Sequence, residues 1–251
     1  MKRSIFVLAA LLTFGLAAAQ TLVYGLSGLP SSLDSVDSQD GNSLVVSGSI
    51  TETLVFFEQG STELVPQLAV AWEPNEDATA WTFQLREGVT FHDGTPFDAE
   101  AVKFNFDRWN VVDHPYGFRD EGKNYVPFSW VFGAPAAEGG ILASVEVVEP
   151  HAVRFTMTQP TPFLPSLLAA VYFQMNSPAA VMEAGADYGT PGVGSVGTGP
   201  FVFDSWREGE LIRVTRNETY WDGPAQVEAV VFRGIAESTS RLAELRAGSI
   251  D

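Results

Sequence analysis

Alternating apolar and polar residues predict a series of short strands along the chain. The clearest runs cover residues 81–86, 141–148 and 152–158, and this period is typical of a strand with one buried face. A further strand is predicted at 89–97, with a turn at Asp93 and Gly94. Shorter apolar runs predict additional strands at 21–26, 198–204, 210–216 and 227–232.

Fewer segments have helical spacing. Apolar side chains recur through residues 99–109 directly after Asp98, whose carboxylate can accept hydrogen bonds from the free N–H groups of the first turn. Residues 42–55 have a looser helical spacing, and a proline-interrupted helix is predicted at 160–171. Residues 240–247 are predicted to form a helix that Gly248 ends. Strands and helices together indicate an α/β fold.

The segment 110–140 shows neither period and is rich in glycine, proline and aromatic residues. Long irregular segments in compact domains tend to be functional or mobile. Two interpretations of its rings remain open, because aromatic side chains can stack on a ligand or fill a core. These rings are Tyr116, Phe118, Tyr125, Phe128, Trp130 and Phe132.

The first residues have the pattern of a secretory signal peptide. Lys2 and Arg3 precede a mostly apolar run over 5–16, and small residues lead to Ala19. The run is shorter than the roughly 20 residues that a membrane-spanning helix needs. We therefore expect a signal peptide at 1–19, cleaved after Ala19, and a mature protein without stable membrane insertion.

The chain contains no cysteine. This excludes a disulfide framework, a thiolate metal site, a catalytic thiol and the acylated cysteine that anchors lipoprotein receptors. Together with the signal peptide, it predicts a freely diffusing periplasmic protein.

The formal net charge is −17, and removal of Lys2 and Arg3 makes it more negative. Nucleic acids and anionic lipid surfaces require clusters of Lys and Arg, so neither is expected as a partner. The acidity suits cationic or zwitterionic solutes, or it serves solubility alone.

Motifs for catalysis, cofactors and metals are weak. The GxGxxG pattern at 192–197 leads into Pro200 and a predicted strand, whereas a dinucleotide site needs a helix there. His92, His114 and His151 are far apart and lack the spacing of metal ligands. No GxSxG nucleophile motif is present. We therefore predict no catalytic residue, no cofactor and no metal site.

One long segment carries a resemblance to a known family. Residues 64–109 contain PxLAxxWE followed by WTFxLRxGVxFHDGTPFxAExVKFxxxR. The later segments GTGPF at 197–201 and RNxxYWDGPA at 216–225 fit the same pattern, as does LxxGxID at 245–251. The chain resembles the family 5 extracellular solute-binding proteins over nearly its whole mature length.

The resemblance implies the two-lobed fold of type II periplasmic binding proteins. We expect a discontinuous lobe I at 20–50 and 178–251, with a smaller domain at 51–177 inserted between its halves. The chain would then be an N-terminal part that lacks the C-terminal lobe. In this family the ligand lies between the lobes and hinge closure buries it.

The resemblance also implies a carrier of solutes and not an enzyme. We expect a monomeric periplasmic substrate-binding component of an ABC importer, with short peptides as ligands and a membrane permease as partner. A nickel-chelate or oligosaccharide receptor of the same fold is the first alternative. A secreted hydrolase is the second, and a truncated chain that serves as an interaction module is the third.

The candidate ligand residues also follow from the resemblance. In the family an LDP-like turn after the first strand lies at the floor of the cleft, and here Ser35 stands in place of the proline. A comparable aromatic loop reaches the ligand in nickel-binding relatives, and main-chain groups satisfy a peptide backbone. The predicted ligand-binding residues are Leu29, Pro30, Ser38, Asp40, Gly41, Asn42 and Trp130.

Overall fold

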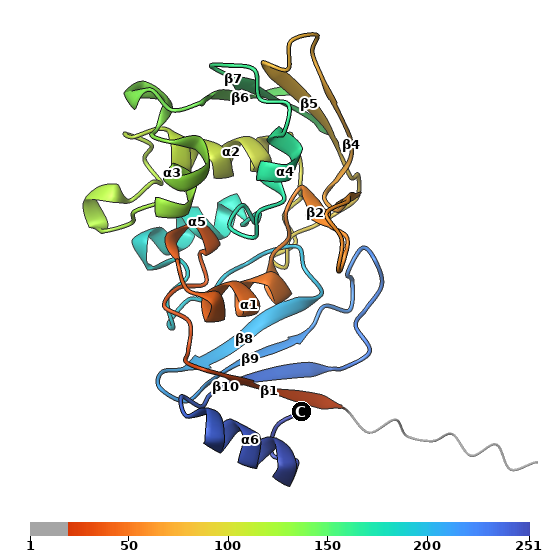
Figure 1. The fold of residues 1–251 in the computed structure, drawn as a ribbon, viewed down its shortest axis with the longest axis vertical. Coiled ribbons are helices and arrows are strands. Elements are labelled where there is room, and N and C mark those ends of the chain that lie inside the picture. The colour runs from red at the N-terminus through yellow and green to blue at the C-terminus, as the bar shows by residue number, and fades with distance from the viewer. Residues whose placement is uncertain (1–19) are drawn as a thin grey trace, which may run out of the picture.

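The computed structural model describes residues 20–251, so the predicted signal peptide lies outside the described residues. Two four-stranded sheets lie toward opposite ends of the long axis, and helix α1 (Gly41–Ile50) lies between them (Figure 1). The mixture of helices and strands confirms the predicted α/β class. No helix within residues 20–251 is long and apolar enough to cross a bilayer.

The first sheet joins the two ends of the described chain. Its order is β1-β10-β9-β8, and only the β1–β10 pair is parallel. Strand β1 therefore lies beside a strand about two hundred residues later in the sequence. All four strands confirm the sequence prediction with small shifts at their ends: β1 (Thr21–Leu26), β8 (Phe201–Arg207), β9 (Leu211–Arg216) and β10 (Ala229–Gly234).

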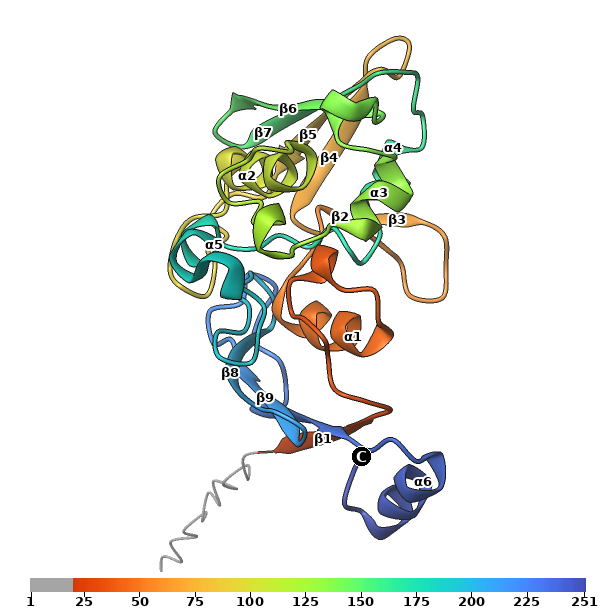
Figure 2. The same cartoon turned by 90° about the vertical axis from the view of Figure 1, so that its left-hand side faces the viewer.

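Helices lie on both sides of this sheet (Figures 1 and 2). Helix α1 buries Val46 and Ile50 in an apolar core that also includes Ile212, Val214 and Phe232 of the sheet. Helix α6 (Ser238–Ala247) lies on the opposite side. It ends as predicted at Gly248, whose left-handed φ of 70° costs glycine little.

The second sheet has the order β4-β5-β7-β6. Helix α2 (Ala99–Asn110) packs against it, and the Asp98 carboxylate accepts a hydrogen bond from the Ala101 N–H at 2.9 Å, which confirms the predicted cap. Burial of Phe106, Phe83 and Phe155 makes this core strongly aromatic. The strands are β4 (Ala69–Pro74), β5 (Ala80–Leu85), β6 (Leu142–Glu149) and β7 (Ala152–Met157).

The aromatic segment 110–140 supplies much of this second core. It contains helix α3 (Val126–Phe132) and two short 3-10 helices, Arg119–Glu121 and Ala136–Glu138, connected by turns and loops. Tyr125, Phe128 and Phe132 are buried, so filling the core is the correct interpretation for these three rings. Trp130 of the same helix is 59% exposed.

The predicted helix at 42–55 is wrong in its second half. Helix α1 ends at Ile50, and strand β2 (Val55–Phe57) pairs with β3 (Leu64–Pro66). Thr51 has extended backbone angles, and its N–H and hydroxyl both donate to the carbonyl of Ser47. The β-branched residues that follow favour extended backbone.

Two further predictions of local structure are corrected. The strand at 89–97 is only an isolated bridge between Thr90 and Pro96, because the turn at 93–94 closes it on one side and the start of α2 at Ala99 ends it on the other. The helix at 160–171 is limited to α4 (Leu164–Leu168). Helix α5 (Pro178–Ala184) was not expected, although Ser177 caps it and proline occupies its first position.

Each sheet has its own apolar core, one near each end of the molecule. The chain passes from the first to the second after α1 and returns before β8. The exact boundaries of lobe I and the inserted domain at 50/51 and 177/178 stay a prediction.

Candidate ligand-binding face

The loop 27–40 leads from β1 to α1 and contains most of the predicted ligand residues. Asp40 ends it as the N-cap of α1, and its carboxylate accepts from the Ser43 N–H at 2.8 Å and from the hydroxyls of Ser43 and Ser31 at 2.6 Å each. Burial raises the pKa of Asp40, but these hydrogen bonds outweigh it and lower the pKa overall. The side chain of Asp40 therefore holds the loop to the helix.

The predicted residues of the loop lie together, but they differ in access. Gly41 is exposed, and a Cβ added there would meet no atom within 4 Å. Leu29 and Asn42 are half-buried, and the Asn42 side chain accepts from the Ser27 hydroxyl at 3.2 Å. Pro30 and Ser38 are buried, so their side chains support the loop. Direct ligand contact by these residues stays a prediction.

Trp130 is connected to this loop through Tyr172. The two rings meet edge to face with centroids 6.0 Å apart. The carbonyl of Tyr172 accepts a hydrogen bond from the Ser35 hydroxyl at 2.7 Å. The aromatic pair is thus anchored to the loop. The Trp130 ring is exposed, as a contact with a ligand would require.

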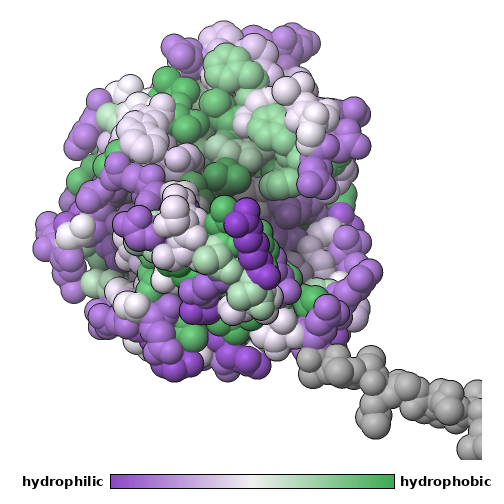
Figure 3. Space-filling model, turned by 60° about the horizontal axis from the view of Figure 1, so that its bottom comes forward, coloured by the Kyte–Doolittle hydropathy of each residue, from purple (hydrophilic) through white to green (hydrophobic). Residues whose placement is uncertain are grey.

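A hollow of about 230 Å³ between α1 and β2 was not found from the sequence. None of the seven predicted ligand residues lines it. Figure 3 shows apolar side chains at the surface around a recess of the face that it presents, inside a largely hydrophilic outline. The residues that line the hollow are Leu44, Val45, Gly48, Thr51, Glu52, Thr53, Phe56, Gln67, Val171 and Gln174.

Glu52 forms the buried polar side of this hollow and is 3% exposed. Its Oε1 accepts from the Tyr220 hydroxyl at 2.7 Å and from Gln67 Nε2 at 3.4 Å. Its Oε2 accepts from the Thr198 hydroxyl at 2.8 Å and from Trp221 Nε1 at 3.0 Å. Burial raises the pKa of Glu52 despite these four donors. The carboxylate joins four segments that are far apart in the sequence.

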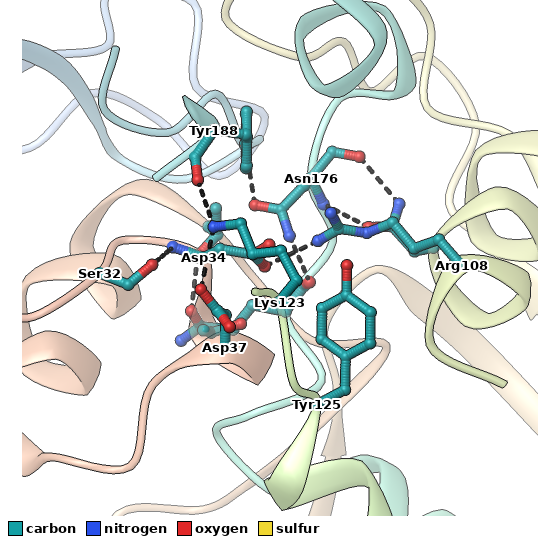
Figure 4. A network of polar contacts seen from close by, with 12 residues as sticks. Ser32, Asp34, Asp37, Arg108, Lys123, Tyr125, Asn176 and Tyr188 are labelled. Carbon is teal, nitrogen blue, oxygen red and sulfur yellow. Dashed lines mark hydrogen bonds and ion pairs between the residues drawn. The ribbon is translucent and has the colours of Figure 1, made fainter. Parts of the chain in front are cut away.

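A second buried network fixes the middle of the loop (Figure 4). The Arg108 guanidinium donates to the Asp34 carboxylate at 2.7 Å, and both side chains are almost completely buried. Lys123 donates to Asp37 and to the carbonyl of Tyr188, at 2.9 Å each. These contacts tie the loop to α2, to the segment that precedes α3 and to Tyr188 after α5.

The histidines and the GxGxxG segment considered above lie within the described residues. Within 20–251, no three His, Asp or Glu side chains gather in a way that could hold a metal ion. The GxGxxG segment at 192–197 is followed by β8 and not by a helix, as the sequence indicated.

His92 gives a prediction for the pH dependence of stability. Burial lowers its pKa, although the hydrogen bond to the Gly199 carbonyl and the nearby Asp93 raise it. A histidine whose pKa is lower in the folded state than in the unfolded state stabilises the fold while it is neutral. This stabilisation is fully present above the unfolded pKa of about 6.5 and is lost as the pH falls through the folded pKa. When the pH is lowered from about 7.5 to about 5, we expect the free energy of unfolding to fall less in His92→Gln than in the wild type. Urea unfolding at both pH values measures this, and equal losses would contradict it.

The described fold combines a sheet built from both ends of the chain, a second aromatic-cored unit, and a recessed face beside the first helix. This is the architecture of the ligand-binding proteins of the periplasmic type. The profile of the family described as bacterial extracellular solute-binding proteins, family 5, matches residues 63–251. The chain belongs to this family.

Individual relatives agree with this assignment. The heme-binding protein A of Haemophilus influenzae is 32% identical over 79% of this chain and 37% of its own length. The dipeptide-binding protein of Escherichia coli is 31% identical over 91% of this chain and 43% of its own length. The structure of the periplasmic binding protein DppA from Helicobacter pylori, in complex with the peptide STSA, superimposes with a TM-score of 0.83 at 30% identity. It covers 92% of this chain and 46% of that protein. This chain thus spans less than half the length of these relatives.

Proposed function

We propose that this protein is the periplasmic receptor of an ABC importer that captures short peptides and presents them to a membrane permease. The family assignment and the similarity to dipeptide- and peptide-binding relatives support this proposal. The protein acts by binding and release and not by catalysis. The described residues would form one wall of the binding site.

One observation carries the proposal: the backbone is open at Gly41, the first residue of α1, directly after a loop that is held rigid. Asp40 caps the helix, and a buried ion pair at Asp34 and a partly buried one at Asp37 hold the loop in place. A peptide needs N–H and C=O partners along an accessible stretch of backbone. A rigid loop supplies them without a large ordering cost on binding.

The test is direct binding by the protein expressed from its full reading frame and purified from periplasm. We expect native mass spectrometry to show a bound mass that leaves on denaturation, and calorimetry to show binding of a pool of di- to tetrapeptides. If the purified protein carries no ligand and binds none of the peptides, the proposal fails. Parallel titrations with a nickel chelate and with oligosaccharides test the alternative receptors, and release of cleaved peptide would indicate a hydrolase.

Substitution of Gly41 is expected to weaken peptide binding. In Gly41→Leu the side chain would cover the open backbone, and we expect a loss of at least about tenfold in affinity, or about 1.4 kcal/mol. Gly192→Leu is the matched control, because Gly192 is also exposed and a Cβ there also meets no atom within 4 Å. Equal peptide affinities of the two variants in calorimetry would show that the backbone at Gly41 is not part of the site.

A further inference from the structure

The hollow between α1 and β2 has the chemistry of a pocket for one uncharged side chain. Its rim is formed by exposed apolar residues: Val45 is 44%, Phe56 43% and Val171 41% exposed. Val171 directly precedes Tyr172, the partner of Trp130, in the sequence. Exposed apolar side chains gathered around a recess mark a binding site more often than scattered ones do.

The lining of the hollow includes one charged side chain, that of Glu52. No lysine or arginine is among its lining residues, and Glu52 contributes a buried carboxylate. Both oxygens of Glu52 already accept two hydrogen bonds each, so the carboxylate is not available to a ligand. A ligand carboxylate placed in the hollow would lose its hydration and face a like charge without a counterion.

Gly48 sets the depth of the hollow. It lies on the side of α1 that faces the recess, and an added Cβ would meet only the Gln174 amide nitrogen, at 3.3 Å. Gln174 is held in place because its Oε1 accepts from the Thr51 hydroxyl at 2.6 Å. Any larger residue at position 48 would therefore extend into the hollow.

From these observations, we infer that the hollow is the specificity pocket for an apolar side chain of the bound peptide, with Gly48 setting the size limit and the lack of a basic side chain in the lining disfavouring Asp and Glu. This rests on the proposed function, because it assumes that a peptide lies on this face. The hollow would distinguish peptides by their side chains, whereas the backbone at Gly41 would make the same contacts with every peptide.

The experiment compares three tripeptides that differ only at the central residue, which is leucine, alanine or aspartate. Calorimetry is carried out with the wild-type protein expressed from its full reading frame and with Gly48→Leu. We expect the wild type to bind the leucine peptide at least about tenfold more tightly than the aspartate peptide. Gly48→Leu should lose affinity for the leucine peptide and keep its affinity for the alanine peptide. Because leucine is the better helix former by up to about 1 kcal/mol, this variant is expected to fold.

A second variant tests the charge argument separately. Val45→Lys places a cation at the rim of the hollow and is expected to raise the affinity for the aspartate peptide severalfold. Val70→Lys is its matched control, since Val70 on β4 is also 44% exposed and does not line the hollow.

The outcomes separate this inference from the proposed function. If the wild type binds none of the three peptides or any peptide of the wider pool, the receptor function itself fails. If it binds all three with equal affinity, the receptor function stands and the specificity pocket is overturned. The specificity pocket is also overturned if Gly48→Leu lowers the affinities for the leucine and alanine peptides equally. It is likewise overturned if Val45→Lys and Val70→Lys change the affinity for the aspartate peptide by the same factor.

Discussion

Replacement of Arg108 by methionine is expected to lower the free energy of unfolding by about 3–5 kcal/mol, because it leaves a buried carboxylate without its charge partner. Asp34 is 0% exposed and Arg108 1% exposed, and the ion pair between them measures 2.7 Å. Methionine fills much of the same volume but provides no hydrogen bond. Urea unfolding followed by circular dichroism measures the change.

Two further variants show whether charge or volume causes this loss. Asp34→Asn combined with Arg108→Met removes both charges, and we expect it to recover part of the stability. Lys103→Met removes the partly exposed ion pair between Lys103 and Asp107 on the same helix, and its effect should stay below about 1 kcal/mol. If the double variant is as unstable as Arg108→Met, the loss comes from packing and the electrostatic explanation is wrong.

Regular elements were largely predictable because their signals are local. The alternation at 81–86 and the Asp98 cap depend on neighbouring residues, and the structure confirms both. The errors arose where two local signals compete. Leu54 and Val55 fit the helical spacing of 42–55, but they also begin an apolar run, and the structure ends α1 at Ile50 and starts β2 at Val55. At 89–97 the turn at 93–94 and the start of α2 at Ala99 limit the pairing to one bridge.

The candidate site was less predictable because long-range contacts assemble it. The hollow combines residues from α1, from β2 and from the segment around Val171. Gly48 has no sequence signal of its own, because a glycine within a helical pattern indicates only a weaker helix. The resemblance to the family directed attention to the loop before α1, but it could not show that Pro30 and Ser38 are buried. Burial depends on the packing of the loop against the second unit.

The network of Glu52 has the same non-local origin and a large expected effect on stability. Glutamine has nearly the shape of glutamate, but one of its two terminal atoms is an N–H donor. If the NH₂ group replaces Oε2, it faces the Trp221 indole N–H, which cannot accept a hydrogen bond. If it replaces Oε1, it faces the Gln67 amide, whose oxygen is already bound to the N–H and hydroxyl of Thr53. In either orientation one N–H of the new amide can donate to the Thr198 or Tyr220 hydroxyl, but its other N–H meets a donor and is left without a partner.

We therefore expect Glu52→Gln to lower the free energy of unfolding by about 2–3 kcal/mol, as is typical when a buried hydrogen bond to a charged group is lost. Tyr220→Phe removes only one of the four donors and should cost about 1 kcal/mol. Because Glu52 joins the segment before β2 to Gln67 after β3, to Thr198 before β8 and to the turn after β9, hydrogen exchange in Glu52→Gln should increase at residues 196–200 and 217–223 as well as around position 52. An increase confined to position 52, or wild-type stability, would show that the carboxylate does not hold these segments together.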